Sequence, residues 1–130
     1  AGFSDYLEDK VLDHVFGGTA YTAPGTLYVG LYTAAPSDSG GGTEVSGGSY
    51  ARKSMPAMTV SGTSPTEATN GAAVEFITAT GSWGTVTHVG VFDASSSGNL
   101  LAWAALTASK TVSSGDVFRF DAGDLDITLA

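Results

Sequence analysis

Residues 27–34 read LYVGLYTA and residues 87–94 read THVGVFDA, two stretches that share the pattern x-x-V-G-[LV]-[YF]-x-A. Side chains along the first alternate between two faces, which is the period-2 signature of a β-strand. Gly30 and Gly90 stand in the middle of these strands, where glycine costs stability unless a bulky ring approaches the bare backbone. We therefore predict that the two strands are neighbours. A ring such as Tyr28, Phe92 or Trp103 should then lie over the glycines.

Further short strands are expected on both sides of this pair, separated by turn-forming residues. They span residues 26–33, 49–60, 72–80, 85–94, 99–107, 110–122 and 124–130. The 49–60 strand should be an edge strand because Pro56 cannot donate to a ladder. These seven or eight short strands without strand–helix alternation predict an all-β fold, an antiparallel β-sandwich that is jelly-roll-like or Ig-like.

One N-terminal amphipathic helix precedes the strands. Ser4 is the expected N-cap, acidic residues follow in the first turns, and Gly17-Gly18 ends the helix. So short a helix needs a packing partner, either the body of the domain or another chain. Its apolar residues are the predicted subunit interface: Leu7, Val11, Leu12, Val15 and Phe16.

The length suits one domain, here residues 1–130. Residues 1–18 form the helix and its cap, and residues 26–130 form the sandwich. Two polar segments, 36–48 and 61–71, are expected to be long loops, the first of them exposed.

The composition excludes several classes of function. About half of the chain is Gly, Ala, Ser and Thr, and there is no Cys, which rules out disulfides, Cys-type zinc sites and a Cys nucleophile. Acidic residues outnumber basic ones 13 to 5, for a formal net charge of −8, so nucleic acid is not an expected partner. No apolar run is long enough for a membrane span, and the acidic N-terminal segment is not a signal peptide. The chain is therefore expected to be made in a host cytoplasm.

The sequence predicts no catalytic, cofactor-binding or metal-binding residue. His14 and His88 are the only candidate general bases, and both are interpreted as capping or packing residues. The carboxylates that could form a glycosidase pair stand mostly at turns, where Asp bonds nearby backbone: Asp93, Asp116, Asp121, Asp124 and Asp126. The last three lack the spacing of an EF-hand loop. The glycine tract at 40–48 lacks the lysine of a phosphate-binding loop.

Two aromatic residues are weak candidates for ligand contact. Trp83 stands in a turn of small residues and Tyr50 beside a glycine-rich loop, and an exposed ring could stack on a sugar. Burial of Trp83 against the end of the sandwich is the more common arrangement for such a residue, and Trp103 is expected in the core.

Three segments carry a resemblance to a known family. They are PSDSGGGTEVSGGSYAR at 36–52, WGTVTHVGVFDA at 83–94 and the closing GDLDITL at 123–129. Together with the N-terminal helix they resemble small virion structural proteins of tailed phages, commonly labelled tail fibre or minor structural protein. The resemblance spans nearly the whole chain. It implies no activity and supplies no catalytic residues.

The resemblance and the residues together predict a non-enzymatic structural component of a tailed-phage virion. A tail or neck fibre subunit is the first expectation and a capsid decoration (cement) protein is the alternative. A host-glycan-binding module is a second alternative, and a hydrolase acting on a cell-surface polymer is the least favoured. The expected partners are further copies of the chain, with a trimer favoured, and other phage structural proteins of the tail, neck or capsid. No membrane partner is expected.

Overall fold

A computed structural model describes residues 2–129, and its largest element is an antiparallel sheet built on three long strands. These are β2 (Leu27–Ala34), β8 (Gly84–Phe92) and β9 (Leu100–Val112). The strand order is β1-β9-β8-β2-β3, with β4 also paired to β2. The shorter strands are β1 (Gly2–Phe3), β3 (Thr43–Glu44) and β4 (Lys53–Met55).

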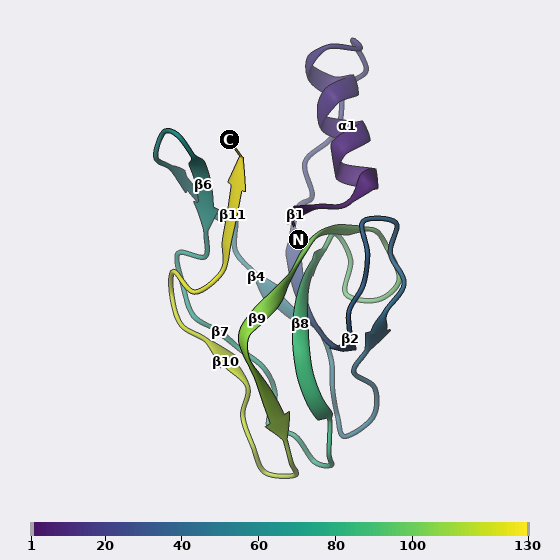
Figure 1. The fold of residues 1–130 in the computed structure, drawn as a ribbon, viewed down its shortest axis with the longest axis vertical. Coiled ribbons are helices and arrows are strands. Elements are labelled where there is room, and N and C mark those ends of the chain that lie inside the picture. Colours follow the sequence, from purple (N-terminus) through teal and green to yellow (C-terminus); the bar gives the residue numbers. More distant parts are fainter. Residues whose placement is uncertain (1, 130) are drawn as a thin grey trace.

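Two smaller antiparallel sheets pack against one face of the large sheet (Figure 1). One pairs β7 (Val74–Glu75) with β10 (Arg119–Phe120), and the other joins β5 (Thr59–Ser61), β6 (Thr66–Thr69) and β11 (Asp126–Leu129). Buried side chains from both layers meet in one core, among them Leu31 and Val86 from the large sheet and Phe118 and Leu125 opposite. The structure thus confirms an all-β, antiparallel, sandwich-like fold with one helix.

The two glycine-centred strands are direct neighbours, as predicted. β2 and β8 pair antiparallel, and their register places Gly30 opposite Gly90. A Cβ added to Gly30 would lie 2.8 Å from Cε1 of Phe92, and one added to Gly90 would lie 3.0 Å from Cε1 of Tyr32. Phe92 is therefore confirmed as a covering ring. The second ring is Tyr32, because Tyr28 lies opposite Phe92 rather than beside Gly90.

Replacing Gly30 with alanine is expected to destabilise the fold by about 1–3 kcal/mol, the usual cost of overpacking. The new methyl group would also lie 2.9 Å from Oε2 of Glu44, so a ring and a carboxylate must both move. Gly25→Ala is the matched control, because nothing lies within 4 Å of its added Cβ and its φ is not positive. Urea denaturation measures both variants. Equal midpoints for Gly30→Ala and Gly25→Ala would show that the rings have room to spare.

The helix α1 (Asp5–Val15) projects from one end of the body (Figure 1). Ser4 is its N-cap, as predicted, and accepts a hydrogen bond from the Leu7 backbone N–H. The Ser4 N–H donates to the Leu101 carbonyl, and the Asp5 N–H donates to that of Asp38. These bonds fix the base of the helix to the body. None of the helical residues is buried.

Several expectations about local structure were wrong. The described residues form eleven strands rather than seven or eight, several of them only two residues long. Segment 61–71 contains β6, and segment 36–48 contains β3 and the buried Val45, so neither is simply a loop. The single strand expected at 49–60 is two strands, β4 and β5, in different sheets on either side of Pro56. The single strand β9 (Leu100–Val112) covers a stretch where parts of two strands, 99–107 and 110–122, were expected.

Candidate functional site

The most distinctive sequence segment, 36–52, folds around a hydrogen-bonded network on the outer side of β2. Arg52 donates from Nε and Nη2 to the two carboxylate oxygens of Glu44, each at 2.9 Å. Its Nη1 donates to the carbonyls of Ala94 and Ser97, at the turn between β8 and β9. The Arg52 side chain is only 9% exposed. One arginine thus joins the 36–52 segment to the β8–β9 turn.

Tyr50 joins this network and supplies an acceptor for a backbone N–H of β2 that lies between two pairing partners. Its hydroxyl donates to Oε2 of Glu44 at 2.7 Å and accepts the backbone N–H of Leu31 at 2.9 Å. That N–H lies where β2 passes from pairing with β4 to pairing with β3. Burial raises the pKa of Tyr50 far above its ordinary value, and the hydrogen bond to Glu44 raises it further. The hydroxyl is therefore a neutral structural donor.

Phe92 brings the second distinctive segment, 83–94, onto the same network. The Arg52 guanidinium lies 3.5 Å from the centroid of the Phe92 ring, and Tyr32 stacks near that ring with 6.2 Å between centroids. Burial, with the charge of Glu44, raises the pKa of Tyr32 to about 12. Asp93 then closes the β8–β9 turn by accepting from the Asn99 backbone N–H at 2.7 Å. The residues of both segments thus hold the fold together.

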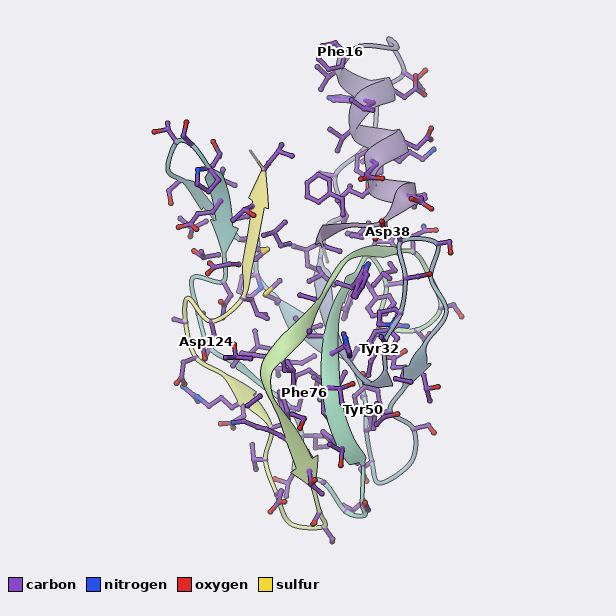
Figure 2. All side chains as sticks on the ribbon, viewed as in Figure 1. Phe16, Tyr32, Asp38, Tyr50, Phe76 and Asp124 are labelled. Atoms are coloured by element: carbon purple, nitrogen blue, oxygen red, sulfur yellow. The ribbon has the colours of Figure 1, made fainter. Side chains whose placement is uncertain are left out.

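Trp83 and Tyr50, the two candidate ligand contacts, pack against each other, and Tyr50 also lies close to Phe76 (Figure 2). Trp83 is 3% exposed, and its Nε1 donates to the Gly48 carbonyl at 2.9 Å. Its ring meets those of Tyr50 and Phe76 edge to face, at 5.3 and 6.4 Å between centroids. The buried arrangement is therefore the correct one for Trp83, whereas the Tyr50 ring is only partly buried.

Trp103 has the opposite outcome, because the expectation that it lies in the core was wrong. It is partly exposed, and its Nε1 donates to Oδ1 of Asp38 beside the base of α1. A bulge in the pairing of β8 with β9 falls between Val91 and Phe92. The bulge shifts the alternation of β9, so Trp103 lies opposite Gly90 on the outer face of the sheet.

Most of the carboxylates and both of the histidines singled out as candidate acids and bases have structural partners. Asp116 accepts from the Ser113 backbone N–H, and Asp124 accepts from that of Asp121, both at 2.9 Å. Asp121 pairs with Arg119, and Asp126 stands in β11. His14 Nδ1 accepts from the Tyr21 backbone N–H, and His88 Nδ1 lies 2.8 Å from the Thr87 hydroxyl. Across residues 2–129, no group of three or more His, Cys, Asp or Glu side chains could hold a metal ion.

The residues of the predicted subunit interface on α1 differ in their exposure to solvent. Leu7 and Val11 are half-buried near the base of the helix. The last turn is open to solvent: Leu12 is 58% exposed, Val15 59% and Phe16 82%. Apolar side chains therefore concentrate at the free end of the helix, where the protein supplies no packing partner for them.

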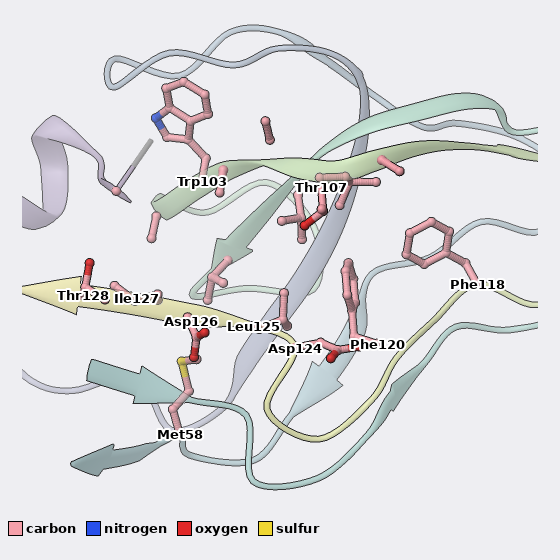
Figure 3. A pocket seen from close by; sticks show the side chains of 18 of the residues that line it. Met58, Trp103, Thr107, Phe118, Phe120, Asp124, Leu125, Asp126, Ile127 and Thr128 are labelled. Atoms are coloured by element: carbon pink, nitrogen blue, oxygen red, sulfur yellow. The ribbon is translucent and has the colours of Figure 1, made fainter. Parts of the chain in front are cut away.

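A second apolar surface lies in a groove between β9 and β11, which the sequence did not predict (Figure 3). Its volume is about 680 Å³. Ala102, Ala104 and Leu106 line one wall, and Leu125 and Ile127 line the other. Leu125, Ile127 and Leu129 alternate along the sequence, which is typical of an apolar strand face. That a groove remains between this face and β9 is shown only by the packing of the sheets.

A family model described as Gp80, podophage GP4 fiber I protein gp80, matches residues 2–128 of this sequence. None of the curated proteins matches the chain. The family match confirms the resemblance to phage fibre structural proteins. In the part of the chain that the structure describes, no helix has the length and apolar character needed to cross a membrane.

Proposed function

Because the chain belongs to the podophage GP4 fiber I protein gp80 family, we propose that it is a non-enzymatic fibre subunit attached to the tail or neck of the particle. A phage fibre protein is a structural component of the virion and associates with other structural proteins of the phage. Attachment through one end of the molecule is supported by how its two ends differ (Figure 1). One end carries a docking helix, and the opposite end carries turns.

The observation that carries the proposal is the unpartnered helix. An isolated helix of 11 residues is marginal in water unless its apolar face is covered. Here Leu12, Val15 and Phe16 remain exposed while hydrogen bonds from Ser4 and Asp5 fix the base of α1 to the body. A subunit that attaches through α1 would cover these side chains at an interface. The predicted interface residues Leu7, Val11, Leu12, Val15 and Phe16 are therefore retained as this docking surface.

Assembly with further copies of the chain is part of the proposal, and a trimer is the favoured state. Gly, Ala, Ser and Thr make up about half of the chain, and such small residues let neighbouring subunits approach closely. The excess of acidic residues keeps the outer surface solvated where many copies stand close together. A capsid decoration protein would use the same features on the shell, so only the place of the chain in the particle separates the two functions. Trp83 is buried and Tyr50 is partly buried, so Trp83 gives the glycan-binding alternative no support.

The test is the position of this chain in the intact phage particle, determined by electron cryo-microscopy. We expect its density at the tail or neck, with α1 against a neighbouring subunit. A particle carrying Phe16→Asp should lose this density. One carrying Val117→Asp should keep it, because Val117 is an exposed apolar residue just before β10 and not on α1. Density on the capsid shell alone would contradict the fibre assignment and support a decoration protein.

A further inference from the structure

The groove between β9 and β11 cannot be filled by the helix of its own chain. α1 leaves the body next to Gly2, which lines one end of the groove, and it points away from the groove (Figure 1). Hydrogen bonds from Ser4 to the Leu100 and Leu101 carbonyls hold it in that direction. An occupant of the groove must therefore come from another molecule.

The apolar wall of the groove continues beyond the body onto an open sheet face. Leu125 is 7% exposed, Ile127 is half-buried and Leu129 is 59% exposed, so one face of β11 passes from core to solvent. Val60 on β5 is 69% exposed and lies in the same cross-strand row as Ile127, through Ala68 of β6. Residues in one row point to the same face of a sheet. The groove therefore opens onto an apolar strip rather than ending at a closed rim.

The opposite wall is shaped for close approach. From β9, Ala102, Ala104 and Leu106 line the groove, and the first two of these have short side chains. Beyond its pairing with β1 at Ala102 and Trp103, β9 has no second neighbour among the described strands. A wall of small residues beside an open edge can accommodate a cylinder of side chains such as an amphipathic helix.

This chain itself contains a segment that fits. The last turns of α1 present apolar residues four apart, Leu12 with Phe16 and Val11 with Val15, the spacing of helices that dock into grooves. α1 also carries four acids and one lysine, and Glu8 stands in the same four-residue row as Leu12 and Phe16. At the β9 rim of the groove stands Lys110, whose ammonium lies 5.9 Å from the centroid of the Phe118 ring. The charged residues that line the groove are balanced, with Lys110 and Arg119 against Asp124 and Asp126. The match with α1 is therefore the one between its apolar stripe and the apolar walls of the groove.

We propose that the β9–β11 groove of one subunit receives the last turns of α1 from a second copy of the chain. The contact is heterologous, with a helix of one subunit in the groove of the next, and such contacts can close into rings. It deepens the proposed function by naming the partner surface of α1, and it would hold equally for a decoration protein. A failure of this contact can therefore be told apart from a failure of the fibre assignment, because the position of the chain in the particle tests only the fibre assignment.

Cross-linking between two single-cysteine proteins tests the contact, since the natural sequence has no cysteine. One protein carries Phe16→Cys at the tip of α1, and its partner carries Thr107→Cys, an exposed position that lines the groove. A matched partner carries Thr85→Cys, an equally exposed threonine on β8 that does not line it. With a short bismaleimide, we expect the Thr107→Cys partner to give about tenfold more mixed dimer, which corresponds to a modest binding preference.

The oligomeric state in solution gives an independent readout. Light scattering after size-exclusion chromatography should show an oligomer for the unmodified chain and a monomer for Phe16→Asp. The Phe16 side chain is 82% exposed, so the substitution should leave the fold intact. Val117→Asp should remain oligomeric. Equal cross-linking of the two threonine positions would overturn the proposal, as would dominant Phe16–Phe16 cross-links or a monomeric unmodified chain at its highest soluble concentration.

Discussion

Replacing Arg52 with alanine is expected to destabilise the protein by about 3 kcal/mol, at the lower end of the usual cost of breaking a buried ion pair. The substitution removes both donors to the Glu44 carboxylate, whose side chain is 25% exposed and therefore remains partly desolvated. It also removes the cation that lies over Phe92 and the donor to two turn carbonyls. In a domain stable by about 5–15 kcal/mol, this is a large share of the total.

Arg119→Ala is the matched control for that measurement. Arg119 also binds two acidic partners, Glu75 and Asp121, at 3.2 and 2.9 Å. Its side chain is 49% exposed, however, and exposed ion pairs contribute little because water solvates both charges. Urea denaturation should therefore show a large shift of the midpoint for Arg52→Ala and almost none for Arg119→Ala. Similar shifts for the two would mean that burial does not set the strength of the Arg52 network.

A double-mutant cycle separates the pair from its surroundings. If Glu44 and Arg52 act together, Glu44→Ala combined with Arg52→Ala should cost less than the sum of the single substitutions, because the second removes a partner that is already lost. Strict additivity would assign the effect of Arg52 to its contacts with Phe92 and the turn carbonyls instead. The 36–52 and 83–94 segments meet at Arg52, so both results measure how strongly the two segments hold each other.

The pairing of β2 with β8 could be predicted from sequence because its determinants are local. Alternation along each strand shows which side chains share a face, and an unfilled position such as Gly30 indicates an approaching ring. β6 could not be predicted in the same way. Its residues Thr66–Thr69 are polar or small, and they form a strand because their backbone pairs with β5 and β11. Val45 is likewise one apolar residue among glycines, and its burial depends on a bond from its N–H to the Leu31 carbonyl.

Only one of the two surfaces of the proposed contact could be predicted from the sequence. The apolar stripe of α1 is a periodic pattern within one segment, so Leu12, Val15 and Phe16 could be identified before their exposure was known. The groove is made by β9 and β11, whose mutual position depends on how two sheets pack. Trp103 shows the same limit, because one bulge between Val91 and Phe92 moves it from the expected inner face to the outer one. The alternation of apolar residues along a sequence does not show where such a bulge falls.

Trp83→Ala is expected to cost about 3–5 kcal/mol, the usual loss when a large buried aromatic side chain is truncated. The ring is 3% exposed and packs against Tyr50 and Phe76, so its removal leaves a cavity at the centre of the aromatic cluster. The Gly48 carbonyl also loses its donor. Gly48 has a φ of +56°, and a Cβ there would lie 2.9 Å from the indole Nε1, so backbone and ring are fitted to each other.

Trp103→Ala is the control for this substitution, because it removes the same side chain from a partly exposed position on the outer face of the sheet. Chemical denaturation followed by circular dichroism should show a much smaller loss of stability for Trp103→Ala than for Trp83→Ala. Equal losses would contradict the buried position of Trp83. The comparison also guards against a false functional result, because any binding that disappears in Trp83→Ala would reflect a disrupted core rather than a lost ligand contact. Only a substitution that leaves the denaturation midpoint unchanged can report on a binding surface of this protein.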